Sequence, residues 1–353
     1  MNKKFLKIKI IVWSIVAIVF SIIFIIFLAN TITSSEYDVK DLIKNSVKNE
    51  SFLSSNKNYD KYITVKSESF SNKINNIDVD WISGEVRVLK SDSNKIKLIQ
   101  KAPSNFSKKK IAKIKVDGNT LSIIDNSAKK FFIGIGLPKS TVLELYLPEK
   151  LYNNINLSTT SADIYSTYLK SNMADIESVS GNIEMSGKID KMTLETTSSN
   201  INIKKLDSKN VTCNSVSGKI QLYGKIDDLN INTTSGDIDL KNMDNKNLIC
   251  ESTSGKVNIE GRFSNIKSEA TSGDIKINSS EMLSYFKCDT ISGDIDLYIP
   301  ENSGFTLDLS KVSGNLNSSF KLLQDGDSYI YKNGTAKMYV DTTSANLNII
   351  KNN

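Results

Sequence analysis

Five aspartates have the residue type and spacing that an acid–base pair would need. They are Asp237, Asp239, Asp274, Asp294 and Asp296. Glycoside hydrolysis requires two carboxylates at a defined separation within a cleft, and parallel β-helix enzymes that act on polysaccharides share the gross shape that the internal repeat of this chain predicts. Equivalent positions of the internal repeat hold Asn182, Lys219 and Lys256, however. Interchangeable polar groups are typical of a solvated face. We therefore expect no enzyme, and a carbohydrate-active β-helix enzyme is the remote alternative.

Metal and cofactor chemistry has little support in the sequence. The chain has no histidine, which is the commonest general base and transition-metal ligand. Cys213, Cys250 and Cys288 each lie four residues before a repeat serine, in an otherwise mainly aliphatic column. Two coils of a stacked sheet separate them by about 9.6 Å, too far for a disulfide, so we expect buried, unreactive thiols. Columns of Asp and Asn could bind calcium, but the repeat is not the nine-residue calcium-binding type. We expect no metal and no cofactor.

One group of lysines could contact an anionic surface. Its members are Lys108, Lys109, Lys110, Lys113 and Lys115. An exposed loop explains them simply, and contact with anionic wall polymers or lipid headgroups is the sharper hypothesis. Elsewhere the charge is unremarkable, because four of the six net positive charges come from lysines among the first nine residues. The remainder is nearly neutral, which argues against nucleic-acid binding.

An internal repeat positions all of these residues. A β-branched residue is followed by the motif serine, a small residue, a polar residue and an aliphatic one, as in S-G-D-I at Ser235. The eleven copies begin at Ser83, Ser161, Ser180, Ser198, Ser217, Ser235, Ser254, Ser272, Ser292, Ser313 and Ser344. From Ser161 to Ser272 the steps alternate between 19 and 18 residues, and they then lengthen to 20, 21 and 31. We expect structural corners, because glycine tolerates positive φ, at Ser180, Gly181, Ser217, Gly218, Ser235, Gly236, Ser254, Gly255, Ser272, Gly273, Ser292 and Gly293.

The columns of the repeat predict the fold. The third residue after the motif serine is always Ile, Val or Leu, and the fifth after and sixth before are mostly large and apolar. This alternation indicates two short strands in each coil, one on either side of the corner. A single coil cannot bury its apolar side, but coils stacked at about 4.8 Å can. The sequence therefore predicts an all-β, single-stranded β-solenoid of about ten coils. Alternating long and short coils predict two kinds of turn on a third side.

The N-terminus predicts a membrane anchor. Residues 10–29 carry no charge and are long enough to cross a bilayer as a helix, and the preceding lysines place the N-terminus in the cytoplasm. A cleavable signal peptide is the rival, although Phe27 at the third position before a cleavage site fits poorly. We expect a single-pass protein of the cell membrane with most of the chain extracellular. The expected segments are a basic tail (1–9), a transmembrane helix (10–29), a stalk (30–75), an N-terminal cap and first coil (76–150) and the regular solenoid with its C-terminal cap (151–353).

The repeated S-G-D-I corner after an apolar N-terminal segment resembles the bacterial "putative adhesin" family, whose members are repetitive β-solenoids of unknown function. The resemblance covers roughly residues 76–350. It implies a surface location and a role in adhesion or envelope stress. We expect a non-catalytic adhesion or interaction module whose partner is a cell-envelope polymer or a membrane protein. A regulatory or structural partner in the response to cell-wall antibiotics is the alternative.

Overall fold

The structure is a computed structural model that describes residues 59–127 and 140–352. In these residues, 21 strands form one continuous sheet, accompanied by two three-residue 3-10 turns. The elements in the first part are η1 (Tyr59–Lys61), β1 (Ile63–Phe70), β2 (Asn76–Lys90), β3 (Ile96–Ala102), η2 (Lys108–Lys110), β4 (Lys113–Asp117) and β5 (Thr120–Ile124). The central elements are β6 (Thr141–Leu147), β7 (Tyr152–Ser178), β8 (Ile183–Thr196), β9 (Ile201–Ser215), β10 (Ile220–Thr233), β11 (Ile238–Ser252) and β12 (Val257–Ser272). The last elements are β13 (Ile275–Ser279), β14 (Tyr285–Ser292), β15 (Ile295–Ile299), β16 (Gly304–Ser313), β17 (Leu316–Ser318), β18 (Leu323–Asp325), β19 (Ser328–Lys332), β20 (Ala336–Ser344) and β21 (Leu347–Lys351).

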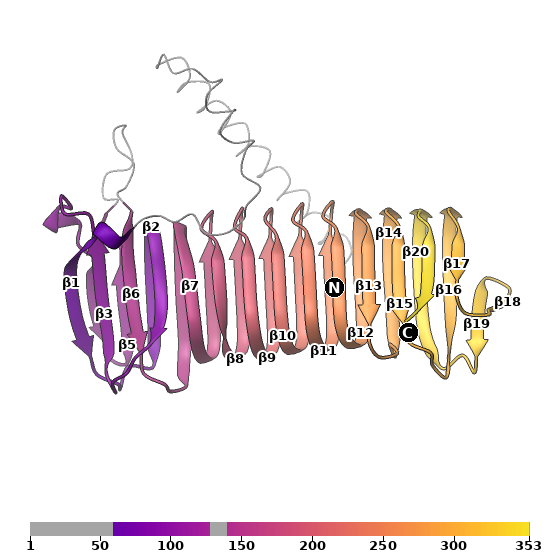
Figure 1. Cartoon of the computed structure of the whole chain (residues 1–353), viewed down its shortest axis with the longest axis horizontal. Coiled ribbons are helices and arrows are strands. Elements are labelled where there is room, and N and C mark those ends of the chain that lie inside the picture. The colour runs from indigo at the N-terminus through magenta and orange to yellow at the C-terminus, as the bar shows by residue number, and fades with distance from the viewer. Residues whose placement is uncertain (1–58, 128–139, 353) are drawn as a thin grey trace, which may run out of the picture. The chain divides into compact units, whose positions relative to one another are not determined.

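The central coils stack in parallel with their repeats aligned. Strands β8 to β12 each begin three residues after one motif serine, and neighbouring strands lie side by side (Figure 1). Ile220 pairs with Ile201 on one side and with Ile238 on the other, so identical repeat positions meet. The prediction of an all-β solenoid is confirmed. Each central coil is a single long bent strand, because the chain keeps pairing with its neighbours around the bend.

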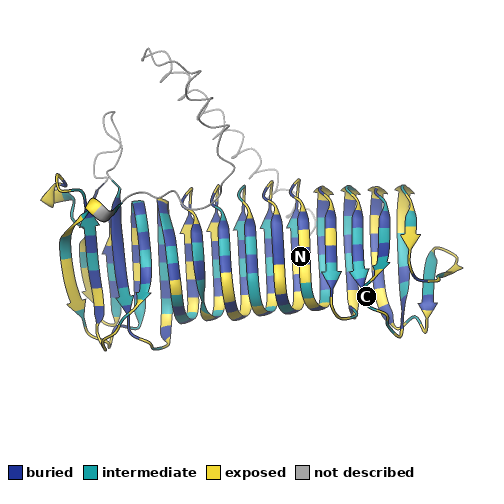
Figure 2. Cartoon of the chain, in the orientation of Figure 1, coloured by how far each residue is buried: buried dark blue, intermediate teal, exposed yellow. Residues whose placement is uncertain are grey.

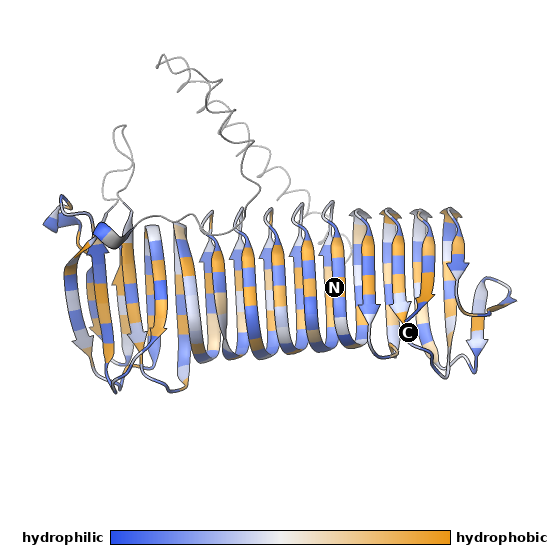
Figure 3. Ribbon diagram, viewed as in Figure 1, coloured by the Kyte–Doolittle hydropathy of each residue, from blue (hydrophilic) through white to orange (hydrophobic). Residues whose placement is uncertain are grey.

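Apolar side chains fill the interior along the whole stack. Ile220, Leu222, Leu229 and Ile231 of β10 are at most 2% exposed. Figure 2 shows buried and exposed residues alternating along the strands, and Figure 3 shows the same alternation in hydropathy. Replacing one such Ile or Leu by Ala would cost about 2–5 kcal/mol, because the neighbouring coils cannot close the cavity. The same aliphatic columns therefore set the register and hold the coils together.

The bend between two corners takes two alternating forms. In the short coils, Lys205 and Asn242 turn the chain with φ of 54° and 49° and direct Leu206 and Met243 into the core. The long coils place a glycine opposite these residues, and a Cβ on Gly224 would lie 2.1 Å from the Leu206 carbonyl oxygen. Large and absent side chains thus alternate, which is the physical basis of the unequal spacing.

The first coil in the sequence is not the first coil in space. β2 pairs with β7 on one side and with β5 and β6 on the other. Beyond these, β3 and β4 pair antiparallel with β6 and β5, and β1 pairs antiparallel with β3. The edge strand β4 carries exposed lysines, which discourage edge-to-edge aggregation. The first motif-bearing coil is therefore protected on both sides.

The C-terminal end repeats this arrangement in reverse. The last coil, β20 and β21, lies between β14 and β15 on one side and β16 and β17 on the other (Figure 1). The hairpin of β18 and β19 then pairs antiparallel with β16. The 31-residue step of the sequence thus contains β17, which ends the outer coil, and the closing hairpin. The final strand pairs on both sides, so it cannot fray as an edge strand would.

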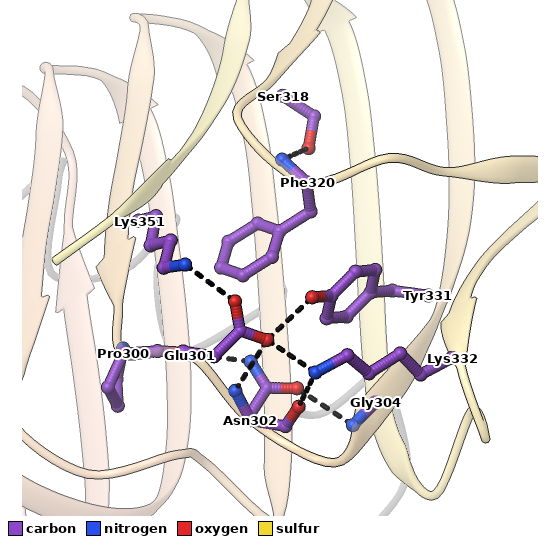
Figure 4. Close-up of polar contacts among 9 residues, drawn as sticks. All are labelled: Pro300, Glu301, Asn302, Gly304, Ser318, Phe320, Tyr331, Lys332 and Lys351. Atoms are coloured by element: carbon purple, nitrogen blue, oxygen red, sulfur yellow. Dashed lines mark hydrogen bonds and ion pairs between the residues drawn. The ribbon is translucent and has the colours of Figure 1, made fainter.

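One carboxylate joins the hairpin to the last strand (Figure 4). Glu301 accepts a hydrogen bond from the Tyr331 hydroxyl at 2.5 Å and pairs with Lys332 at 2.6 Å and Lys351 at 2.7 Å. Three hydrogen bonds to the ionised form, the first from Lys332, lower the pKa of Glu301. The Phe320 ring packs edge-on against the Tyr331 ring, with 4.9 Å between the ring centroids. We name this contact the Glu301 latch.

The expected single-pass membrane anchor requires correction. Within the described residues no helix is long and apolar enough to cross a membrane. The helical segments found there are three-residue turns, whereas a span takes about 20 residues. The predicted transmembrane helix (10–29), the basic tail before it and most of the predicted stalk lie outside the described residues.

Candidate binding surface

The predicted corner residues hold neighbouring coils together. The Oγ atoms of the motif serines donate to the preceding coil, for example Ser217 to the Thr197 carbonyl at 3.3 Å and Ser180 to the Thr160 carbonyl at 3.2 Å. A Cβ on Gly255 would lie 2.0 Å from the Gly236 carbonyl oxygen, so the backbones approach too closely for a side chain. The corners between successive coils contain Ser180, Gly181, Ser217, Gly218, Ser235, Gly236, Ser254, Gly255, Ser272, Gly273, Ser292 and Gly293. Of these, Ser272 and Ser292 are the last residues of β12 and β14.

Most of the aspartates that could have formed a catalytic pair instead link coils. Asp237 Oδ1 accepts a hydrogen bond from the backbone N–H of Lys256 at 2.9 Å. Asp294 Oδ1 accepts one from the backbone N–H of Asn346 at 3.0 Å. The same contact recurs with amides, since Asn200 Oδ1 accepts from the next coil at 2.8 Å. Asp and Asn are interchangeable here because each supplies one acceptor oxygen. Two more of the five aspartates also contact a neighbouring coil: Asp274 pairs with Lys256, and Asp296 accepts a hydrogen bond from Asn348.

Asp239 is the most buried of the five. It is 6% exposed and lies within 3.3 Å of Lys219, Lys241 and Gln221. Burial acts to raise the pKa of this carboxyl, but hydrogen bonds from Lys241, Gln221 and Lys219 outweigh it and the pKa is lowered. An acid catalyst for glycoside cleavage needs the opposite shift. Asp239 is therefore held as a carboxylate in an ion-pair network.

The three cysteines fill the core of alternate coils, as predicted. Cys213, Cys250 and Cys288 are free thiols and fully buried. Burial raises the pKa of Cys213 and Cys250 to about 12. Since the thiolate is the reactive form, these groups are poor nucleophiles and poor metal ligands at neutral pH.

The predicted lysine group lies at the N-terminal end of the stack. Lys108 and Lys109 are exposed in η2, and Lys113 and Lys115 are exposed on β4. Lys115 pairs with Asp117 of the same strand at 2.8 Å, while Lys110 is half-buried. The structure thus brings the five lysines to one end of the solenoid, and their contact with an anionic envelope polymer stays a prediction.

The clearest departure from the repeat is a pair of tyrosines that the sequence did not single out. Tyr285 of β14 and Tyr339 of β20 point outward, and each is 37% exposed. Their ring centroids are 5.8 Å apart and the ring planes meet at 43°. They are 54 positions apart in the sequence, and they meet only because the last coil is inserted beside β14. No local periodicity signals that insertion.

The tyrosines lie in a checkerboard with two lysines. Tyr285 is paired across the sheet with Lys337, and Lys287 with Tyr339, so the aromatic rings occupy one diagonal. We name the outward residues of β12, β14 and β20 the tyrosine face; they are Asn265, Lys267, Glu269, Tyr285, Lys287, Asp289, Lys337, Tyr339 and Asp341.

Ion pairs fix four of the six charged residues of the tyrosine face. Lys267 pairs with Glu269 at 2.6 Å, and Lys287 pairs with Asp289. The hydrogen bonds that these lysines donate to the carboxylates raise the pKa of both lysines. On the neighbouring strand β11, burial and then the charge of Glu269 raise the pKa of Glu251. The face therefore carries no net charge, because its three lysines balance its three carboxylates, Glu269, Asp289 and Asp341.

Comparison with solved structures reveals similar chains at low identity. A "Putative lipid binding protein" from Parabacteroides distasonis ATCC 8503 is 17% identical, with a TM-score of 0.47 over 81% of this chain and 96% of that chain. A "putative adhesin" from Parabacteroides merdae ATCC 43184 is 12% identical, with a TM-score of 0.43 over 81% and 96%. A "putative adhesin" from Bacteroides fragilis NCTC 9343 is 15% identical, with a TM-score of 0.36 over 80% and 96%. Scores this low support no inference about function.

The family comparison is more informative. No curated protein is significantly similar to this sequence. The family model described as Toastrack DUF4097 matches residues 74–188 and 186–350, which include every motif serine and the strands β2 to β20. Two successive matches, meeting near β8, agree with the continuous stack of coils. The chain therefore belongs to the Toastrack DUF4097 family.

Proposed function

We propose that this protein is a non-catalytic adhesion and interaction module that binds an extended cell-envelope polymer along its stack of coils. The observation that carries the proposal is the in-register repetition of outward polar side chains. Identical repeat positions meet between adjacent coils at the spacing of β-strands, about 4.8 Å. A surface that repeats its chemistry at constant intervals complements a ligand that also repeats.

Rigidity of the outward groups supports a binding role. Asn182 Oδ1 and Asn200 Oδ1 accept hydrogen bonds from the next coil, and Arg262 donates two hydrogen bonds to Asp244 of the preceding coil. Side chains that are already ordered lose little conformational entropy when a ligand binds. Each coil need contribute only weakly, because a polymer that contacts several coils gains affinity from the later contacts being intramolecular.

The arrangement of the carboxylates favours a module without catalytic turnover. Carboxylate oxygens accept hydrogen bonds from a neighbouring coil at Asp237, Asp294 and Asp296. Neighbouring cations hold Asp239 in its ionised form. Hydrolysis of a glycoside would need one of two such groups to be a proton donor near neutral pH. The positions and contacts of these aspartates thus support a structural role.

The test compares ligand length and turnover in the same samples. Purified full-length protein is titrated with short and long fragments of isolated cell-wall glycan and of anionic wall polymer, while released reducing ends are measured. We expect affinity to rise with fragment length and no products to form. Length-independent binding, binding of no polymer, or release of products would contradict the proposal.

A further inference from the structure

The tyrosine face is the part of the outer surface at which the repeat gives way to exposed, touching aromatic rings. In the part of the chain that the structure describes, several large apolar and aromatic side chains are exposed, and Tyr285 and Tyr339 are the two tyrosines among them. We propose that these two rings are a stacking platform for an uncharged, linear glycan chain. This inference deepens the proposed function, on which it rests, by naming the site and the ligand class.

The fold does not require aromatic residues at these positions. On the adjacent strand β12, the position aligned with Tyr285 is Asn265, and the position equivalent to Tyr339 is Lys267. Both tyrosines are outward, and their strands continue with buried Phe286 and Met338 in the core. Their role is therefore not core packing, and an exposed apolar surface on an otherwise polar face points to binding.

The geometry suits a sugar ring better than a peptide strand. The hydrogen-bonding edges of β14 are both occupied, by β12 and β20, and those of β20 by β14 and β16. No backbone donors or acceptors remain there for an added strand. An aromatic face instead attracts the C–H groups of a pyranose ring. The lysines of the checkerboard and the neighbouring Asp289 and Asp341 can then hydrogen-bond the sugar hydroxyls.

The balanced charge of the tyrosine face favours an uncharged glycan over an anionic polymer. The cations Lys267 and Lys287 are already paired with Glu269 and Asp289. The carboxylates Glu251, Glu269 and Asp289 follow one another on neighbouring coils, next to the tyrosines. The lysines of the face balance its carboxylates, so a polyanion gains no net attraction there. A chain of neutral sugars needs no net charge on the face, and the coil spacing is close to the length of one sugar residue, so successive rings can meet successive coils.

The decisive variant introduces residues that the fold already accepts in these rows. In the full-length protein, Tyr285→Asn and Tyr339→Lys together copy the adjacent coil. Binding is measured by calorimetry with β-1,4-linked hexasaccharides of N-acetylglucosamine and of glucose. We expect about a tenfold or greater loss of affinity, because both stacking contacts are removed. Replacing both tyrosines by phenylalanine should retain most of the binding, because the rings remain.

The matched control is Tyr298→Ala. The Tyr298 ring is outward on β15 and lies 5.2 Å from the Lys276 ammonium, outside the tyrosine face, so its loss should leave affinity unchanged. Should the double variant fold poorly, perturbation of labelled tyrosine signals in the native protein on titration is the independent measurement. Equal affinity of native and double-variant protein, or no perturbation of Tyr285 and Tyr339 signals, overturns the inference. If long wall polymers bind but the hexasaccharides do not, this inference fails while the proposed function stands.

Discussion

The alternation of long and short coils predicts a sharp difference between two glycine substitutions. Gly224 has φ of 144°, and a Cβ there would lie 2.1 Å from the Leu206 carbonyl oxygen and 2.7 Å from its nitrogen. Gly118, in the turn between β4 and β5, has φ of 58°, and a Cβ there would meet nothing within 4 Å. Alanine at either position must adopt a positive φ. Only Gly224→Ala must also displace the backbone of the neighbouring coil.

The expected free energies follow from those two terms. A positive φ costs an L-residue about 1–2 kcal/mol, and this is the whole expected effect of Gly118→Ala. Displacing packed backbone adds about 1–3 kcal/mol. We therefore expect Gly224→Ala to lower the free energy of unfolding by about 2–5 kcal/mol, with the effect concentrated in β9, β10 and β11.

The assay must resolve position as well as magnitude, because stacked coils need not unfold as one unit. Denaturant unfolding of the full chain gives the total change, and hydrogen exchange locates it. Faster exchange in β9, β10 and β11 for Gly224→Ala, with little change there for Gly118→Ala, is the expected result. If the two variants lose the same stability, or if Gly118→Ala loses more, the steric explanation of the alternating bends is wrong.

Three further predictions concern charge and reactivity. The pKa of Glu301 is lowered in the folded state, so the latch contributes stability above the ordinary Glu pKa of about 4.5 and loses it as the pH falls below that value. Glu301→Gln should therefore speed hydrogen exchange in β18, β19 and β21 at pH 7 and remove the extra acid sensitivity of these strands. The control variant Glu281→Gln should do neither. The raised thiol pKa of Cys213 and Cys250, about 12, predicts negligible labelling by a thiol reagent at pH 8 until denaturant is added, and rapid native labelling would refute their burial. Neutralising the three lysines of η2 should weaken salt-sensitive binding to anionic wall polymer, and unchanged binding would leave η2 as a solvated turn.

The core of the fold could be predicted because its signal is local and repeated. Every coil places an aliphatic residue three positions after the motif serine, and the structure buries Ile220, Ile238 and Val257 at this position. Strand alternation then requires outward polar neighbours. The unequal coil lengths also held information, since Gly224 lies opposite Leu206. Such features depend only on a residue and its counterparts in adjacent coils.

The order of coils could not be predicted in this way. Ser313 precedes Ser344 in the sequence, yet the coil of Ser344 lies between those of Ser292 and Ser313. All coils have similar apolar columns, so each fits equally well against any other, and the aliphatic pattern does not fix their sequence in space. Only the 31-residue step hinted at an irregularity. The tyrosine face depends on this order, and for that reason sequence reasoning missed it.

The same insertion links stability with recognition. A solenoid must protect its last strand from fraying and from pairing with other chains, and here the chain does so by returning between two earlier coils. That return places Tyr339 between β14 and β16, with Tyr285 on one side and its cross-strand partner Asp308 on the other. In a direct stacking order the two rings would lie two coils apart, about 9.6 Å, and could not form one platform. The non-repeating surface therefore arises at the coil where the topology itself departs from simple repetition, which is where a repeat protein can acquire a specific site without altering its regular coils.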